Sequence, residues 1–185
     1  MIVVSGPSGV GKSTVVAALA GRHPFHFSVS VTTRAPRAGE AEGVDYRFVT
    51  VDEFAAMRER GELLESAEYS GRLYGTPSAP VLDRLQAGED VLLDLEVLGA
   101  VQVKEAFPES VTVFIAPPEL EELELRLRKR GDTGPEEAAR RLEIARWQLA
   151  VAGEHFDHVV VNTSVEATAD EIMRILESLP TKADP

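Results

Sequence analysis

Eight residues near the N-terminus have the spacing of a phosphate-binding loop, G-x-x-x-x-G-K-[ST], in the run Gly6-Pro7-Ser8-Gly9-Val10-Gly11-Lys12-Ser13. Glycines at this spacing let backbone N–H groups curl around phosphate oxygens without Cβ clashes. Lys12 can supply a mobile positive charge to the β- and γ-phosphates, and the Ser13 hydroxyl can ligate Mg²⁺. The motif predicts a nucleoside triphosphate site over residues 6–14, Thr14 included, with Lys12 as a catalytic residue.

Two arginines, Arg34 and Arg37, lie three residues apart in a glycine-containing loop. Two guanidinium groups can hold a phosphate dianion through paired hydrogen bonds, although solvated surface arginines are the alternative. Asp94 ends a short apolar run, the usual position of an acid near Mg²⁺ in P-loop proteins. We therefore expect Ser13 and Asp94 to be the metal ligands, and Glu96 to lie on the same strand face as Asp94.

Short apolar runs alternate with segments of helical periodicity, which predicts an α/β layer fold. The expected strands cover residues 1–4, 27–31, 91–94, 111–115 and 158–161. The expected helices cover residues 12–20, 52–60, 76–87, 119–129, 135–152 and 163–179. The expected N-caps are Asp52, Thr76 followed by Pro77, Thr133 and Thr163.

The amino-acid composition argues against several classes of protein. The chain has 185 residues, with 31 acidic residues against 19 basic ones and a net charge of −12, which argues against wrapping a nucleic-acid duplex. The absence of Cys excludes disulfides and thiolate metal sites. No apolar run approaches a membrane span and no basic, then apolar, signal segment is visible, so we expect a cytoplasmic protein with neither a membrane nor a nucleic-acid partner.

The segment Ser30-Val31-Thr32-Thr33-Arg34-Ala35-Pro36-Arg37-Ala38-Gly39-Glu40 resembles the corresponding segment of guanylate kinases. The resemblance continues through residues 43–48, 64–65, 74–77, 126–131, 141–142 and 160–162, and covers nearly the whole chain. It implies a P-loop α/β core with a parallel β-sheet flanked by helices, a small mixed α/β GMP-binding insertion and a helical lid. It also implies phosphoryl transfer from ATP to GMP, and to dGMP, with Mg²⁺.

The resemblance places these parts in a single domain over residues 1–179. The core is expected at about 1–32, 77–125 and 147–179, the insertion at about 33–76 and the lid at about 126–146, with residues 180–185 as a tail. The lid segment carries seven basic and four acidic residues, a local excess of +3 in an acidic protein. That charge suits an anionic ligand.

The resemblance also assigns residues to the two substrates. The residues implied for GMP are Ser30, Arg34, Arg37, Glu40, Tyr46, Glu65, Tyr74, Thr76 and Glu96. Asn162 joins the loop residues on the ATP side, and the implied catalytic residues besides Lys12 are Arg34, Arg126, Arg130 and Arg141. A carboxylate at position 65 can accept hydrogen bonds from the guanine N1–H and 2-amino groups together, a donor pair that adenine lacks.

The match is imperfect between Asp94 and Gly99. Glu96 stands where the family usually has Asp, and Leu98 stands where it usually has Gln. Two alternatives therefore stay open. One is a related P-loop kinase acting on another phosphorylated acceptor, such as a ribose phosphate. The other is a catalytically weak, guanylate kinase-like binding module.

Overall fold

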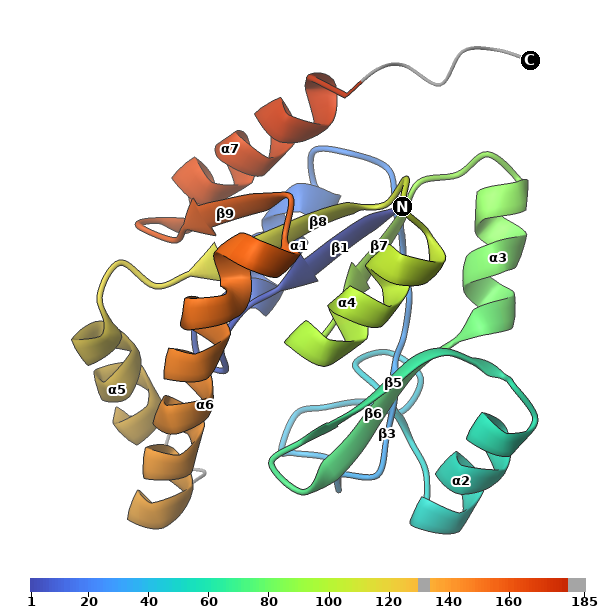
Figure 1. Ribbon diagram of the computed structural model, residues 1–185, viewed down its shortest axis with the longest axis horizontal. Helices are drawn as coiled ribbons and strands as arrows, with labels where there is room; N and C mark the ends of the chain where they lie inside the picture. The colour runs from blue at the N-terminus through green and yellow to red at the C-terminus, as the bar shows by residue number, and fades with distance from the viewer. Residues whose placement is uncertain (130–133, 180–185) are drawn as a thin grey trace. The chain divides into compact units, whose positions relative to one another are not determined.

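The computed structural model describes residues 1–129 and 134–179 and has an α/β fold in which parallel strands are flanked by helices (Figure 1). The chain divides into two compact units. Unit 1 comprises Met1–Ser5 and Phe25–Thr112, and unit 2 comprises Gly6–Pro24 and the chain from Val113 onward. The two units are described separately below.

Three parallel strands of unit 1 lie in the order β2 (His26–Phe27), β7 (Val91–Asp94), β1 (Ile2–Ser5). All of β1 is buried, as are the first three residues of β7. Continuous apolar strands of this kind are typical of parallel sheets covered on both faces. Helix α4 (Val97–Ala106) follows β7 directly and packs on β1, so the chain turns back across the sheet at the carboxyl end of β7.

A second sheet in unit 1 has the order β4-β3-β6-β5, and its long β5–β6 hairpin crosses the front of the unit in Figure 1. Its strands are β3 (Val31–Thr32), β4 (Arg47–Phe48), β5 (Leu63–Tyr69) and β6 (Arg72–Pro77). Helix α2 (Val51–Glu59) packs against this sheet around a small core of Val31, Phe54 and Met57. Helix α3 (Ser78–Gln86) continues from β6.

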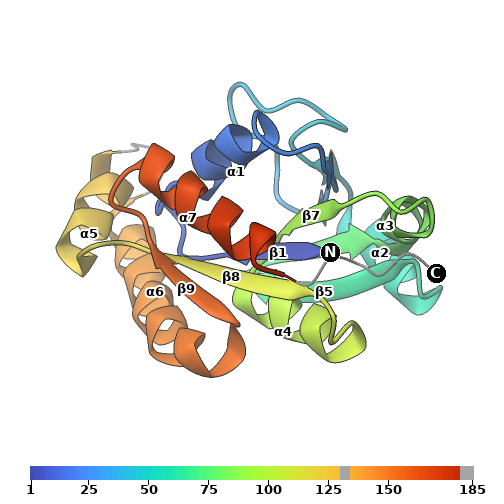
Figure 2. The same ribbon diagram turned by 90° about the horizontal axis from the view of Figure 1, so that it is seen from above.

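In its described residues, unit 2 contains the parallel pair β8 (Val111–Ala116, from Val113 onward) and β9 (His158–Val161) with four helices. Its helices are α1 (Lys12–Ala20), α5 (Leu120–Lys129), α6 (Pro135–His155) and α7 (Val165–Glu177). Helices α1 and α7 run side by side (Figure 2), joined by ion pairs from Arg22 to Glu166 and Asp170. Helices α5 and α6 pack as a second pair.

The prediction of the α/β class is confirmed, and helix 12–20 and strands 91–94 and 158–161 have the expected bounds. The single strand expected over residues 27–31 is wrong. The chain instead forms β2 in the parallel sheet and β3 in the second sheet, with Ser28–Ser30 between them. Among residues 1–129 and 134–179, no helix is long and apolar enough to cross a membrane.

Three of the four expected helix N-caps are corrected, and the fourth lies outside the described residues. Helix α2 is capped by Thr50, which forms a reciprocal capping box with Glu53, so Asp52 lies inside the helix. Helix α6 begins after Gly134, whereas Thr133 lies outside the described residues. Ser164, rather than Thr163, accepts the Ala167 N–H at the start of α7. Pro77 occupies the N-cap of α3, because Thr76 belongs to β6.

Candidate active site

The phosphate-binding loop follows β1 in the chain and leads into α1. Gly6, Gly9 and Gly11 have φ angles of 149°, 85° and 102°, which L-residues with side chains rarely adopt. A Cβ at Gly6 would lie 2.3 Å from the Ile115 carbonyl oxygen, so the loop also needs glycine there for space. Glycine is therefore the residue that suits these positions, and glycines of this kind let a loop curl its N–H groups around an anion.

The start of α1 is electrostatically suited to a phosphate. Its N-cap, Gly11, provides no side-chain hydrogen bond, and its first turn holds no acidic residue. The positive end of the helix dipole is thus not compensated by a neighbouring carboxylate within the helix. The Lys12 ammonium group donates a 2.8 Å hydrogen bond to the Gly6 carbonyl oxygen, which folds it back across the loop. Ser13 and Thr14 are exposed in the same turn.

The Val10 carbonyl oxygen anchors the loop to two other parts of unit 2. It accepts hydrogen bonds of 2.7 Å from Asn162 Nδ2 and 3.1 Å from Arg126 Nη1. The buried Asn162 in turn accepts a 3.0 Å hydrogen bond from the Thr168 hydroxyl of α7. Arg126 also pairs with Glu122 one turn earlier on α5. Asn162 and Arg126, which the resemblance implies on the ATP side, therefore contact the loop itself in this structure.

Arg141 is the buried arginine of α6. Its Nε donates a 3.0 Å hydrogen bond to Glu137, while its Nη1 is buried and has no hydrogen-bond partner within the described ranges 1–129 and 134–179. A buried guanidinium nitrogen is costly unless a ligand or water completes its hydrogen bonding, so Arg141 is a candidate contact for an anion. Arg130, the other arginine expected here, lies outside the described residues.

In unit 1, Arg34 is fixed by a carboxylate. Its two terminal nitrogens donate 2.9 Å hydrogen bonds to the two oxygens of Glu40, and the Arg37 backbone N–H donates to the same carboxylate at 2.7 Å. Hydrogen bonds from Arg34 hold the pKa of Glu40 below its usual value. Glu40 therefore orients Arg34, and the half-buried Arg37 follows in the same turn.

Aromatic rings surround Arg34. Its guanidinium lies 5.3 Å from the Tyr46 ring centroid and 5.8 Å from that of Phe48. The Tyr46 and Tyr74 rings meet edge to face with centroids 6.0 Å apart. Burial raises the pKa of Tyr46, and the carboxylates of Asp94 and Glu96 add to this effect. The expected arginine and tyrosines therefore do come together, and the raised pKa keeps the Tyr46 phenol a neutral donor.

Glu65 is a buried carboxyl group on β5. It is 5% exposed, and its Oε1 accepts a 2.8 Å hydrogen bond from the hydroxyl of Thr76, its register partner on β6. Burial raises the pKa of Glu65 to about 7, opposed by the Thr76 hydrogen bonds and reinforced by the Glu96 carboxylate. The expected pair of Glu65 and Thr76 is thus brought together by the hairpin register.

The remaining expected residues of unit 1 lie at element boundaries. Asp94 is the last residue of β7. The expectation that Glu96 continues that strand is wrong, because Glu96 is the N-cap of α4. Ser30 immediately precedes β3 and its carbonyl accepts the Arg47 N–H. Leu98, the second departure from the family pattern, is 50% exposed in the first turn of α4.

Two residues at the site were not predicted from the sequence. Thr168 supports Asn162 from α7, and Gly99 lies against Glu65 from α4. A threonine at N4 of a helix and a glycine in a helical first turn carry no chemical signal of their own. Only the tertiary contacts reveal them.

An α/β fold with a glycine-rich phosphate loop between a strand and a helix defines a P-loop nucleotide-binding protein, and the half-buried Arg34 and buried Arg141 are suited to phosphoryl transfer. The chain belongs to the guanylate kinase family, whose pattern it matches over residues 1–179. It is 51% identical over 177 residues to a guanylate kinase of Frankia casuarinae, covering 95% of this chain and 96% of that one. A guanylate kinase of Synechococcus is 49% identical over 95% of this chain and 81% of its own.

Solved structures agree. The guanylate kinase of Anaplasma phagocytophilum is 37% identical, with a TM-score of 0.81 over 99% of this chain and 87% of that chain. The shikimate kinase of Acinetobacter baumannii is 15% identical, with a TM-score of 0.52 over 96% of this chain and 92% of that chain. The second likeness shows the fold alone. The resemblance to guanylate kinases noted from the sequence is confirmed.

Proposed function

We propose that the protein transfers the γ-phosphoryl group of ATP to GMP, and to dGMP, forming ADP and GDP or dGDP. The observation that carries this proposal is the buried Glu65 carboxyl group, held by Thr76 between two strands. In its ionised form this group accepts hydrogen bonds from guanine N1–H and the 2-amino group, whereas adenine presents an acceptor at N1. A buried polar site discriminates strongly because the wrong base leaves its groups unpaired.

The aromatic-lined Arg34 supports the acceptor-phosphate part of this proposal. Its Nε is buried without a hydrogen-bond partner in the described part of the chain, while Glu40 holds its other two nitrogens. Arg37, Tyr46 and Tyr74 would add donors around the same phosphate. Ser30 and Glu96 would complete the contacts to the nucleoside. Glu40 acts in this scheme through Arg34.

On the donor side, the loop N–H groups, Lys12 and the α1 N-terminus would hold the ATP phosphates, with the Arg126, Arg130 and Arg141 guanidinium groups stabilising the developing charge. The donor set fits Mg²⁺, because the Ser13 hydroxyl and Asp94 carboxylate are the hard oxygen ligands that this ion prefers. Bound Mg²⁺ would neutralise phosphate charge. A GMP phosphate oxygen attacks the γ-phosphorus as the bond to the β-phosphate oxygen breaks, so no side chain is needed as a base.

The proposal is tested by an ADP-release assay with Mg·ATP and each nucleoside monophosphate in turn. Turnover with GMP and dGMP but little with AMP, CMP or UMP is the expected result. Turnover with a ribose phosphate instead would favour the related P-loop kinase. Nucleotide binding without turnover on any acceptor would favour a binding module.

A pair of variants then tests the base-reading role. Glu65→Ala should raise the Michaelis constant for GMP at least about tenfold, because a lost buried charged hydrogen bond costs about 1.5–3 kcal/mol. The constant for ATP should change little. Glu68→Ala, an exposed acid on the same strand, is the matched control and should leave both constants unchanged. Equal effects of Glu65→Ala on ATP and GMP would remove Glu65 from base recognition.

A further inference from the structure

Gly99 lies in the first turn of α4, directly against the carboxyl group of Glu65. A Cβ at position 99 would lie 2.3 Å from Glu65 Oε2 and 2.9 Å from Glu65 Cδ. Both distances are far below van der Waals contact. The Glu65 carboxyl group therefore occupies the space that any side chain at position 99 would need.

The backbone does not require glycine here. Gly99 has an ordinary helical conformation and is absent from the glycines with positive φ. Alanine is preferred over glycine inside helices, so a helical glycine without a packing reason is disfavoured. Gly153, in the last turn of α6, provides the contrast, because a Cβ there would meet nothing within 4 Å. Space for Glu65 is thus what distinguishes Gly99.

The two oxygens of Glu65 are fixed from different sides. Thr76 donates to Oε1 from β6, and the α4 backbone at Gly99 lies beside Oε2. A third element, β5, sets the side chain's origin through its pairing with β6. The position of the carboxylate edge is consequently determined by the hairpin and by the first turn of α4 together.

We propose that Gly99 is a positioning residue for guanine specificity: its missing side chain lets α4 approach β5 closely enough to set where the Glu65 carboxylate meets the base. This inference rests on the proposed function, in which Glu65 reads guanine. Two parallel hydrogen bonds to one base edge require accurate placement, and a misplacement of about 1 Å can lower turnover by about a hundredfold. A Cβ at position 99 would have to displace Glu65 Oε2 by about 1 Å, since normal contact begins at 3.4 Å and the two atoms would otherwise lie 2.3 Å apart.

The first test compares Gly99→Ala with Gly153→Ala, two helical glycine-to-alanine changes. Gly99→Ala should raise the Michaelis constant for GMP at least about tenfold and leave that for ATP within about twofold. Gly153→Ala should change neither constant. A Gly99→Ala enzyme with wild-type GMP kinetics would overturn the inference, as would equal losses toward ATP and GMP.

The second test separates positioning from general damage to α4. Glu65→Asp shortens the side chain by one methylene, which lowers GMP affinity but empties the space beside Gly99. Adding Gly99→Ala to Glu65→Asp should then raise the GMP constant by less than about twofold further. An undiminished tenfold effect in the Asp background would show that Gly99 acts independently of Glu65, and would overturn the inference.

Melting temperatures keep the test decisive if Gly99→Ala folds poorly. In that case the Glu65→Asp, Gly99→Ala double variant should melt at a higher temperature than Gly99→Ala alone, because the shorter carboxylate no longer collides with the alanine Cβ. An equally low melting temperature of the double variant would count against the inference. The assay of the wild-type enzyme distinguishes a failure of the proposed function from a failure of the role of Gly99. A wild-type enzyme that does not use GMP defeats the proposed function, whereas a wild-type enzyme that uses GMP and an unaffected Gly99→Ala variant defeat only the role of Gly99.

Discussion

The ionised Glu65 carboxylate that the proposed function requires is unfavourable for folding stability. Burial raises its pKa to about 7 from an ordinary value of 4.5, helped by the nearby Glu96 carboxylate and opposed by Thr76. Between these pH values the folded protein keeps a proton that the unfolded chain releases. Folding stability therefore falls as pH rises through this window, by on the order of 3 kcal/mol in total.

Glu65→Gln removes this titration while keeping an oxygen that can accept the Thr76 hydrogen bond. We expect the variant to be more stable than the wild type at pH 8, by up to about 3 kcal/mol, and equally stable below about pH 4. Urea unfolding from pH 4 to pH 8 measures the difference. A stability difference that does not vary with pH would contradict the assigned cause, and Glu68→Gln on the exposed side of β5 is the control.

The ion pair of Arg34 and Glu40 should change folding stability with pH in the opposite direction from Glu65. Hydrogen bonds from Arg34 lower the pKa of Glu40, so this pair stabilises the fold above the ordinary carboxyl pKa and loses that effect as pH falls through the lowered one. Glu40→Gln should cost about 1–2 kcal/mol at pH 7 and nothing at low pH. It should also raise the Michaelis constant for GMP, because Arg34 loses its orienting partner.

The matched control for Glu40→Gln is Glu89→Gln. Glu89 also pairs with an arginine, Arg84, at 2.9 Å, but both side chains are largely exposed. Such pairs contribute little, so we expect a change within about 0.5 kcal/mol and unchanged GMP kinetics. If both variants behave alike in denaturant and in the assay, the Arg34 pair has no special role.

At the scale of elements, α7 supports the phosphate loop through a relay of two hydrogen bonds, from Thr168 to Asn162 and from Asn162 to the Val10 carbonyl. Thr168→Val keeps the side chain's shape and leaves the buried Asn162 oxygen without this donor. We expect a loss of about 1–3 kcal/mol in unfolding free energy and a higher Michaelis constant for ATP, with that for GMP unchanged. Thr163→Val, at an exposed position beside Asn162, should alter neither.

Elements bounded by clear turn residues in the sequence were predicted well. Helix 12–20 lies between glycines, and the apolar runs at 91–94 and 158–161 stand between turn residues, so their bounds were visible in the sequence. The apolar alternation from Phe27 to Val31 does not reveal that the chain leaves one sheet and enters another. Which strand a residue pairs with is a tertiary fact, and local pattern cannot supply it.

The candidate site, like the fold, could be predicted from the sequence only in part. Motif spacing predicts Lys12 as a site residue, the resemblance to guanylate kinases implies Arg34 and Glu65, and the structure shows their surroundings. Thr76 was expected both as a helix cap and as a base contact, and the β5–β6 register removes the first role. Gly99 and Thr168 could not be predicted, because their importance arises from contacts with residues 34 and 6 positions away in the chain.

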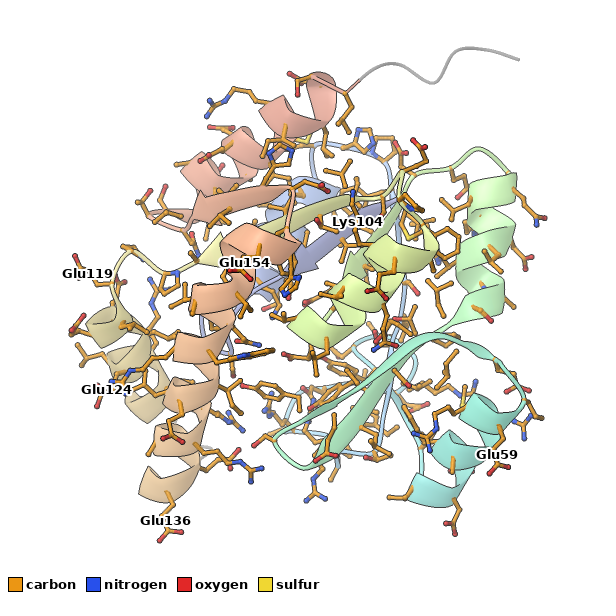
Figure 3. The ribbon with its side chains drawn as sticks, in the orientation of Figure 1. Glu59, Lys104, Glu119, Glu124, Glu136 and Glu154 are labelled. Atoms are coloured by element: carbon orange, nitrogen blue, oxygen red, sulfur yellow. The ribbon has the colours of Figure 1, made fainter. Side chains whose placement is uncertain are left out.

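At the scale of the whole molecule, the net charge of −12 is compatible with phosphate ligands because charge is distributed unevenly. Glu59, Glu119 and Glu136 are exposed, and Figure 3 shows them at the periphery of the units that carry them. The arginines with buried nitrogens, Arg34 and Arg141, lie inward. Local field, rather than net charge, then determines whether a phosphate can bind.

The expected donor and acceptor residues fall largely in different compact units, which predicts separable ligand responses. A ligand at a hundred times its dissociation constant stabilises the native state by about 2.7 kcal/mol. In a thermal-shift experiment, Lys12→Ala should lose most of the stabilisation by Mg·ATP and retain that by GMP, because in the proposed function the ammonium group contacts only the donor phosphates. Glu65→Ala should show the reverse pattern, since in the proposed function the Glu65 carboxylate contacts only the acceptor base. If either variant loses both responses together, the two binding sites are not independent and the assignment of these two residues to separate substrates fails.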